Sequence, residues 1–537
     1  LRNRTAKAKI HGTEHERVIE RGCPQGGVLS PLLWNILEDE ILVEFQQQRR
    51  HLQGFADDNS FLVSGPDPIT LGQLAQRAIN RLQAWADRRH IKFAPAKSEC
   101  ILFTRRRRRA APELRMYGQT IPRVRQCKYL GVILDDKLSW RPHIHHVVSK
   151  ALAALAQCRR SVGASWGITP QTMHWLYTRV VLPALEYGCV VWIPGTNSSH
   201  LQDRLRKVQR MACMCITAAY GSTPTKGLEM FLGLPPLHIH LQAVAVKTAH
   251  RLRLNGKWRA NAAAGNMSHV HVCNKLLEQF ETMAMPADHM VTQWNLDRKY
   301  RAAITRREDF VAPEWPDPAE GELHGYTDGH GTGSGFTITV PGERLQISLP
   351  LAQFADVFQA EVYAIKNACD EISARDTQQH HVTIFTDSQA ALMAVMANKI
   401  YSPLVKSCVE SLNSLAGRCR SVTLQWVPSH SGYQGNEEAD SLAKTASTTR
   451  GVGPEPILPV PKALCSREVD LWVTRTHNTE WRREQTCRQS KLMWPRSNRA
   501  KAKQRLGLKR PDLRNVIQIL SGHANLNRHR CVAKQTL

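Results

Sequence analysis

Residues 381–391 read HVTIFTDSQAA, and this stretch decides the fold class of the C-terminal half of the chain. The β-branched and apolar run at its start predicts a strand that ends at Asp387. Ser388 can then cap a helix over 389–397, because its hydroxyl can accept from a backbone N–H group of the first turn. A carboxylate between a strand and the helix that follows lies where open α/β sheets bind ligands.

Two further carboxylates stand at comparable points of predicted structure. Asp328 lies between a short strand-like run and the glycine-rich stretch 329–335, and the apolar alternation after that stretch predicts a hairpin. Asp440 lies in the first turns of a predicted helix that Asn436 can cap. Each of these signals is weak when it is taken alone.

Glu361 is the fourth carboxylate, and it lies within 357–374, which predicts a helix with an apolar stripe at helical spacing. The residue falls on that stripe, and a carboxylate that faces a core is costly unless something pairs with it. On its own, the position is explained more simply by a glutamate at the edge of the stripe that reaches water. The order of the four carboxylates, with His430 before the last, favours a metal ion instead.

Carboxylate oxygens are the ligands that hard divalent cations prefer in proteins. Two Mg²⁺ ions about 3.5–4 Å apart can clamp the attacking and leaving oxygens of a phosphodiester. The four acidic residues therefore predict a metal-dependent nuclease site.

The motifs around these residues resemble a type 1 ribonuclease H domain over about 323–446. The matching pieces are YTDG at 326–329, AE at 360–361, FTDS at 385–388, WVPSHSG at 426–432, GNE at 435–437 and AD at 439–440. The resemblance implies that Asp328, Glu361, Asp387 and Asp440 bind two Mg²⁺ or Mn²⁺ ions. It also implies that His430 assists proton transfer or product release from a loop, and that the substrate is the RNA strand of an RNA–DNA hybrid.

The composition fits a protein that binds nucleic acid. The chain has 537 residues, with 72 Lys and Arg against 46 Asp and Glu, and a formal net charge of +26. With a nuclease site present, phosphate binding explains this excess better than solubility alone. No apolar run is long enough to span a membrane, so we expect no membrane partner and an intracellular protein of the cytoplasm or nucleus. The fourteen cysteines are scattered and are expected to be free thiols.

A second group of motifs lies in the N-terminal part. Residues 21–31 read RGCPQGGVLSP, a turn-rich stretch before an apolar helix expected over 32–45. Gln25 and Gly26 could let the backbone approach a nucleotide closely, although an ordinary loop before a core helix explains the pattern as well. The run GFADDN at 54–59 reads as a tight hairpin turn.

The adjacent aspartates of that turn, Asp57 and Asp58, leave two readings open. Aspartates are frequent turn formers. They can also bind Mg²⁺. A five-arginine run follows at Arg105, Arg106, Arg107, Arg108 and Arg109, and it is either a solvated loop or a loop that contacts phosphates.

Together these motifs resemble a reverse transcriptase palm. The Pro-Gln-Gly loop resembles the motif that grips template and nucleotide, and Phe-Ala-Asp-Asp the metal-binding hairpin. Lys97 resembles the lysine that contacts the incoming triphosphate, and YLGV at 129–132 the primer-grip hairpin. Palms of this family carry another catalytic aspartate upstream of Pro-Gln-Gly, and no Asp precedes Asp39 in this chain. We therefore expect a fragment with an incomplete polymerase site.

The order of the two regions resembles the replication polyprotein of non-long-terminal-repeat retrotransposons of the I-element and jockey type. The resemblance implies RNA-directed DNA polymerase activity in the full-length parent, with template RNA and target DNA as partners. No oligomeric state is predicted. Two other functions stay open: an integrase- or transposase-like DNA nuclease, which typically uses three carboxylates, and a non-catalytic nucleic-acid-binding remnant of a mobile element.

The predicted fold class is multidomain α/β. We expect a partial reverse transcriptase palm (α+β) over 1–140, a helical thumb or connector over 141–254, a tether over 255–321, a ribonuclease H-like α/β domain with a mixed central sheet over 322–447, and a basic C-terminal extension over 448–537. Three tryptophans of the helical part are expected to be core anchors: Trp166, Trp175 and Trp192.

Overall fold

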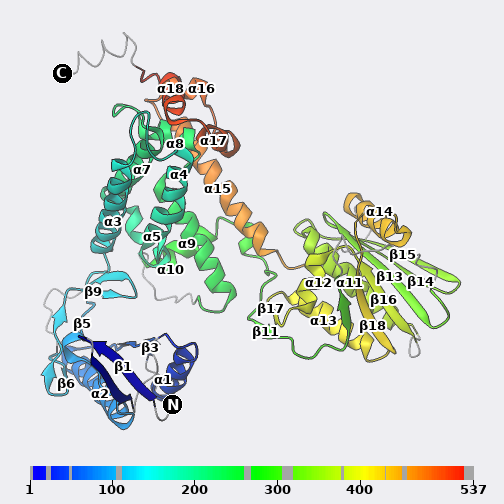
Figure 1. Cartoon of the computed structure of the whole chain (residues 1–537), viewed down its shortest axis with the longest axis horizontal. Helices are drawn as coiled ribbons and strands as arrows, with labels where there is room; N and C mark the ends of the chain where they lie inside the picture. The colour runs from blue at the N-terminus through cyan, green and yellow to red at the C-terminus, as the bar shows by residue number, and fades with distance from the viewer. Residues whose placement is uncertain are drawn as a thin grey trace. The chain divides into compact units, whose positions relative to one another are not determined.

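The chain forms two compact units, Leu1–His143 and Ile144–Leu537, and each is considered by itself (Figure 1). The computed structural model describes residues 4–11, 13–19, 26–47, 51–104, 112–258, 268–304, 318–375, 380–429, 431–449 and 456–524. Three of the sequence predictions lie outside these residues, namely those on Gln25, on His430 and on the run Arg105–Arg109.

The first unit is built on two helices and several short antiparallel ribbons. The core lies between α1 (Ser30–Gln47) and α2 (Pro68–Arg88), where Phe45 and Trp85 are each 1% exposed. The helix expected over 32–45 is thereby confirmed. The strands of this unit are β1 (Arg4–Ile10), β2 (Thr13–Ile19), β3 (His51–Phe55), β4 (Asp58–Leu62), β5 (Cys100–Ile101), β6 (Arg115–Met116), β7 (Gln119–Thr120), β8 (Arg123–Val124), β9 (Gln126–Tyr129) and β10 (Val132–Asp135).

Both hairpins expected from the sequence of this unit are present. β3 pairs with β4 so that Phe55 lies opposite Asp58, which leaves a two-residue turn. β9 pairs with β10 around Leu130 and Gly131, which both have positive φ angles of 44° and 82°. Two central residues with positive φ give the turn whose twist matches that of the flanking strands.

The second unit begins with a helical part. Its elements are α3 (Arg141–Arg160), α4 (Pro170–Leu176), the π-helical η2 (Tyr177–Val181), α5 (Leu182–Glu186), α6 (Cys189–Trp192), η3 (Ile193–Asn197), α7 (Ser199–Thr217), α8 (Thr225–Leu232) and α9 (Leu237–Leu254). Among the described residues no single helix has the length and apolar composition to cross a membrane, although the bent pair 170–186 and 189–197 meets that test jointly. The cysteines within the described ranges are all free, as expected.

The three tryptophans of this part do not share one role. Trp192 is fully buried, as a core anchor should be, but Trp166 is 61% and Trp175 is 55% exposed. The interpretation of Trp166 and Trp175 as core anchors was wrong. The inward face here is held by Met173 of α4 and Tyr177 at the start of η2, which are four residues apart and fully buried, so Trp175 between them points outward.

The C-terminal extension completes this helical part. It forms α15 (Lys462–Arg483), α16 (Arg488–Met493), α17 (Arg499–Leu506) and α18 (Arg510–Ser521), which pack on α9, α8 and α7. Arg510 is 4% exposed and donates hydrogen bonds to the carbonyls of Cys215 (3.0 Å), Ile216 (3.4 Å) and Ile168 (3.1 Å from Nε). A buried guanidinium thus satisfies carbonyls at the C-terminal end of α7, which the helix itself leaves unpaired.

The segment expected to be a tether has structure in its described residues. It contains α10 (His269–Leu277), η4 (Glu281–Met283), β11 (Gln293–Trp294) and β12 (Arg301–Ala303). β12 is an edge strand of the largest sheet, parallel to β18 (Ser421–Trp426), with Arg301 opposite Thr423. The tether interpretation is corrected for these residues, because strand pairing with a segment far along the chain ties them to the following domain.

That sheet has six strands in the order β12-β18-β16-β13-β14-β15. β13 pairs in parallel with β16 and antiparallel with β14, so the sheet is mixed, as predicted. The remaining elements are β13 (Glu322–His330), β14 (Gly333–Val340), β15 (Glu343–Pro350), α11 (Val357–Ser373), β16 (His381–Thr386), α12 (Gln389–Met396), β17 (Lys399–Ile400), α13 (Pro403–Ala416) and α14 (Gln434–Thr448).

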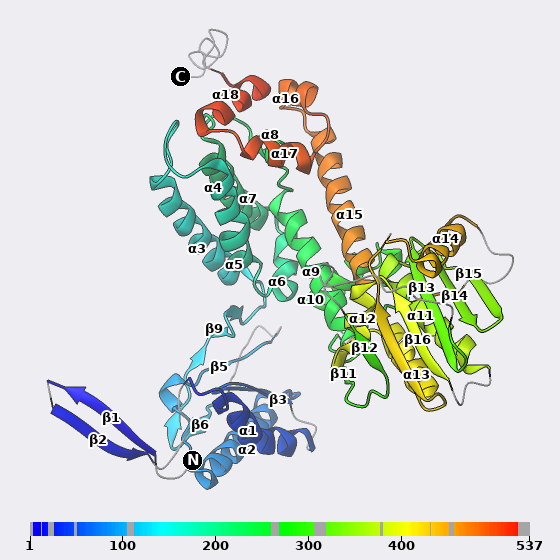
Figure 2. The same ribbon diagram turned by 45° about the vertical axis from the view of Figure 1, so that its right-hand side comes forward.

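Glycines let helices approach both faces of this sheet closely. A Cβ on Gly329 would lie 2.4 Å from the backbone nitrogen of Glu361 in α11, and one on Gly335 would lie 2.4 Å from that of Ala443 in α14. Gly335 pairs with Asp328 across the ladder and so shares its face, whereas the next residue, Gly329, faces the other way. α11 and α14 therefore cover opposite faces of β13 and β14 (Figures 1 and 2).

Candidate metal centre

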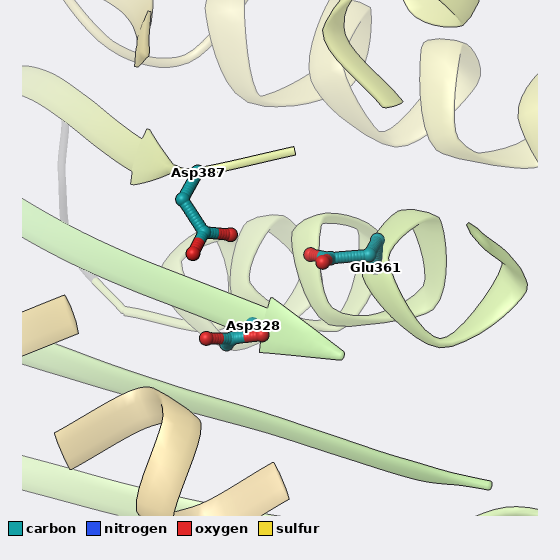
Figure 3. Close-up of side chains that lie close together, drawn as sticks. All are labelled: Asp328, Glu361 and Asp387. Atoms are coloured by element: carbon teal, nitrogen blue, oxygen red, sulfur yellow. The ribbon is translucent and has the colours of Figure 1, made fainter. Parts of the chain in front are cut away.

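Three carboxylates meet at the C-terminal ends of two parallel strands. In the ladder between β13 and β16, Thr327 lies opposite Thr386, so the next residues along each chain, Asp328 and Asp387, are neighbours. Glu361 reaches the same point from α11. Ligand oxygens of the three side chains lie within 4.8 Å of one another, and Figure 3 shows the side chains turned into one space.

The hydroxyl of Ser388 accepts from the backbone N–H of Ala391 at 3.3 Å, so the helix cap expected after Asp387 is confirmed. This cap starts α12 immediately after the carboxylate and fixes the direction in which the chain leaves the site. The local sequence signal and the sheet register therefore agree on where Asp387 stands.

Two of the three carboxylates are deeply buried. Asp328 and Glu361 are each 6% exposed, and within the described part of the chain Oε2 of Glu361 has no hydrogen-bond partner. Burial, and then the charge of Asp387, raises the pKa of Asp328 to about 7. Burial, and then the charge of Asp328, raises the pKa of Glu361 to about 10.

A buried carboxylate without a partner destabilises the folded state. Removal of one partner from a buried ion pair typically costs roughly 3–5 kcal/mol. A divalent cation would offset that cost, and an all-oxygen donor set suits Mg²⁺ or Mn²⁺. The residues present therefore fit the metal ions that the sequence predicted.

Asp440 lines the same cavity from α14 but is not one of the three converging groups. Its Oδ2 lies 2.6 Å from Nζ of Lys444, one helical turn later. The hydrogen bond to Asp440 raises the pKa of Lys444 above its usual value. Asp440 thus keeps a cationic partner of its own at the edge of the site.

The cap expected at Asn436 is wrong. α14 begins at Gln434 with Tyr433 before it, so Asn436 lies inside the first turn, 3% exposed, and lines the cavity instead. The helix therefore begins three residues earlier than the capping signal suggested.

The cavity has a volume of about 210 Å³, and its lining includes residues that were not predicted as site residues. Those residues are Gly329, His330, Ser429, Asn436 and Glu437. All but His330 stand within the quoted motifs, and each stands within four residues of a predicted site residue. Adjacency along the chain does not say which side chains face a site, so the lining had to come from the structure.

The predicted residues of the first unit do not form a comparable group. Asp57 and Asp58 are exposed at the β3–β4 turn, Lys97 is exposed at the end of η1 (Pro95–Lys97), and Gly26 has a φ of 83° ahead of α1. Among the described residues, the one cluster of three or more acidic, histidine or cysteine ligands is that of Asp328, Glu361 and Asp387.

The acid buried nearest this hairpin is one that the sequence did not single out. Glu38 of α1 is 4% exposed, and burial raises its pKa. A Cβ on Gly54 would lie 2.2 Å from Oε1 of Glu38, so the glycine that precedes Phe-Ala-Asp-Asp leaves room for that carboxyl.

Comparison with known proteins separates the same two regions. The family model for reverse transcriptase (RNA-dependent DNA polymerase) matches residues 2–134, and that for RNase H matches residues 321–448. A putative 115 kDa protein of the type-1 retrotransposable element R1DM of Drosophila melanogaster is 27% identical over 229 residues, which is 43% of this chain and 22% of the relative. In these two regions the chain is similar to the reverse transcriptases of R1- and jockey-like non-long-terminal-repeat retrotransposons.

Other relatives support the same grouping. The RNA-directed DNA polymerase from mobile element jockey of Drosophila melanogaster is 26% identical over 48% of this chain and 28% of its own length. A retrovirus-related Pol polyprotein from element R1 of Nasonia vitripennis is 23% identical over 40% of this chain and 65% of its own length. The chain thus spans less than two thirds of the length of each of these three curated relatives.

Solved structures of RNase H1 proteins are also similar to part of this chain. RNase H1 from the halophilic archaeon Halobacterium salinarum is 20% identical, with a TM-score of 0.20, over 24% of this chain and 97% of that protein. LC11-RNase H1, in a crystal structure with an RNA/DNA hybrid, is 18% identical, with a TM-score of 0.20, over 23% of this chain and 98% of that protein.

Proposed function

We propose that the ribonuclease H domain cleaves the RNA strand of RNA–DNA hybrids with two Mg²⁺ or Mn²⁺ ions held by Asp328, Glu361, Asp387 and Asp440. The observation that carries this proposal is the convergence of three carboxylates, two of them buried, within a domain that the RNase H family model matches. Bound divalent ions would supply charge neutralisation and a polarised water for phosphodiester hydrolysis.

The chain's own residues would hold and shape this site. Asp328 and Glu361 place their carboxylates at buried positions, where opposite charges attract more strongly than in bulk solvent. Lys444 keeps the Asp440 carboxylate beside the cavity at 2.6 Å. His430, four residues after Trp426 ends β18, would assist proton transfer or product release, as the family resemblance implies.

For the reverse transcriptase region we propose template and nucleotide contacts without DNA synthesis by this chain. Gln25, Gly26, Lys97 and the run Arg105–Arg109 would contact nucleic acid, and Asp57 and Asp58 would bind a metal ion in the full-length parent. The support is that no third ligand joins Asp57 and Asp58 among the described residues. The parent would be an RNA-directed DNA polymerase that uses template RNA and target DNA.

The test is cleavage of a labelled RNA–DNA hybrid in Mg²⁺, beside single-stranded RNA and duplex DNA of the same sequence. We expect cleavage of the hybrid's RNA strand, and loss of several orders of magnitude in rate for Asp387→Asn with hybrid binding retained. Asp370→Asn is a matched control, because that aspartate is exposed and paired with Lys366.

Three outcomes would contradict the proposal in different ways. If Asp387→Asn cleaves the hybrid at the rate of the parent chain, the assignment of Asp387 as a metal ligand is wrong. Preferred cleavage of duplex DNA would favour the integrase-like alternative, and hybrid binding without any cleavage would favour the non-catalytic remnant.

A further inference from the structure

The ribonuclease H domain is acidic within a strongly basic chain. Residues 321–448 contain eight Lys and Arg against thirteen Asp and Glu, a net charge of −5 with histidines neutral, whereas the whole chain carries +26. Five of those eight cations pair with acids of the same domain: Arg344, Lys366, Arg375, Lys406 and Lys444. Binding of a polyanionic duplex depends on cations that neutralise phosphates, so the domain's cations outside these ion pairs, Lys399 among them, and those of adjoining segments matter most.

The segment directly before the domain adds an aromatic surface beside Lys399. β11 pairs antiparallel with β17, and Trp294 lies opposite Lys399. Nζ of Lys399 is 4.7 Å from the centroid of the Trp294 ring, a cation–π contact. Trp294 is nevertheless 63% exposed, and the neighbouring Leu296 is 78% exposed.

Hydrogen bonds hold this ribbon rigidly against the end of α12. Arg298 donates to the carbonyl of Met396 and to Oδ1 of Asn398 at 2.8 Å. The hydroxyl of Tyr300 donates to the carbonyl of Val395 at 2.7 Å, and Tyr300 is 5% exposed. The exposed Trp294 ring therefore stands on a fixed support rather than on a loose linker.

The same helix connects the ribbon to the metal centre. α12 begins two residues after Asp387 and ends at Met396, where β17 follows (Figure 1). Eight helical residues span about 12 Å. That length equals roughly three to four base-pair steps of a duplex at about 3.4 Å each. The ribbon therefore follows the metal centre along the chain after one short helix.

Charge favours a nucleic acid as the occupant of this surface. The segments 291–304 and 389–402 carry four basic side chains against one acidic side chain, Asp297. The basic ones are Arg298, Lys299, Arg301 and Lys399. Exposed aromatic rings beside cations are the groups with which proteins hold sugars, bases and phosphates of nucleic acids.

We propose that Trp294 and Lys399 form a docking platform for the RNA–DNA hybrid, with Lys399 on a phosphate and Trp294 packed on the adjacent sugar. Trp294 lies outside the residues that the RNase H model matches, whereas Lys399 lies within them. The proposal rests on the proposed function only for the identity of the duplex. It would supply the binding energy that an acidic domain lacks, at a fixed distance from the cleavage point.

The test uses the full chain, with binding measured in an Asp387→Asn background so that the hybrid stays intact. Trp294→Ala and Lys399→Gln should each weaken binding of a 20-base-pair hybrid by about tenfold. Lys399→Gln should also reduce the slope of log affinity against log salt by about one, as loss of one phosphate contact does. Lys399→Arg should restore the slope, and Lys406→Gln, whose lysine pairs with Glu410, is the matched control.

Cleavage kinetics separate this proposal from the proposed function. With the Asp387 site intact, Trp294→Ala should raise KM about tenfold and leave kcat near the parental value. Parental affinity and KM in both platform variants, while the parent still cleaves, would overturn the platform and leave the nuclease. If the parent chain does not cleave the hybrid but the platform variants bind it more weakly than the parent does, the platform is supported and the proposed nuclease function is rejected.

A protein occupant gives a different result. If Trp294→Ala changes the sedimentation behaviour of the free chain and leaves the affinity for the hybrid unchanged, the surface joins two copies and the proposal is overturned. Unfolding curves of both variants check the fold, and a loss of binding that accompanies a lost unfolding transition is not counted for the platform. The folded Lys399→Arg variant then decides, and the platform is rejected if that variant also fails to keep parental binding.

Discussion

Replacement of Glu361 by glutamine should stabilise the ribonuclease H domain when no divalent cation is present. Glu361 is 6% exposed, and burial raises its pKa from 4.5 to about 10. Between these values the folded state keeps a proton that the unfolded chain releases, so this carboxyl makes the folded state less stable as pH rises. Asp328, whose pKa is raised from 3.8 to about 7, acts in the same direction over a narrower range.

The size of the effect follows from the two ionisation ranges. At pH 8 an unfolded glutamate lies about 3.5 units above its pKa of 4.5, and each unit corresponds to about 1.36 kcal/mol, which sets an upper bound of about 5 kcal/mol. Relaxation and water entering the cavity reduce the penalty on a buried charge, so we expect about 2–4 kcal/mol. Glutamine keeps the shape of the side chain and removes the titration.

Calorimetry in a chelator at pH 5 and pH 8 measures the effect. The domain transition of the parent should move to lower temperature at pH 8, and Glu361→Gln should move it back up by roughly 2–4 °C for each kcal/mol. Added Mg²⁺ should stabilise the parent more than the variant, because binding to the folded state alone raises stability. Glu410→Gln is the control, since that side chain is 64% exposed.

Two results would refute the reasoning. One is a parent whose metal-free stability does not change between pH 5 and pH 8. The other is a Glu361→Gln variant that is less stable than the parent at pH 8 in chelator, which would mean that the charged carboxylate already has a stabilising partner.

Three further outcomes are expected. Gly335→Ala should destabilise the ribonuclease H domain by about 1–3 kcal/mol in chemical denaturation, because its Cβ would lie 2.4 Å from the backbone nitrogen of Ala443; an unchanged midpoint would mean that α14 shifts freely. Arg510→Met should cost the helical part about 2–4 kcal/mol, read from its unfolding transition, because buried carbonyls at the end of α7 lose their donor. Primer extension on poly(rA)·oligo(dT) with Mg²⁺ should give no product, and extension that Asp57→Asn abolishes would show that another carboxylate completes the site.

Local signals in the sequence were sufficient for the framework of the candidate site. The strand that ends at Asp387, the cap at Ser388, the hairpin after Asp328 and the helix that carries Glu361 are all present. Each depends on side-chain periodicity or on hydrogen bonds within a few residues, which a single stretch of chain specifies by itself. The mixed character of the sheet was likewise predictable from the order of these elements.

Contacts between distant segments decided the rest. β12 pairs with β18 and β11 pairs with β17, so the segment expected to be a tether is part of the domain. No local sequence pattern around Trp294 predicts that Lys399 is its partner. The burial that shifts the pKa of Glu361 likewise arises only where α11 meets the end of β13 at Gly329. Periodicity tells which face of an element is apolar, but which distant element covers that face, and which polar groups are trapped beneath it, depends on packing of the whole chain.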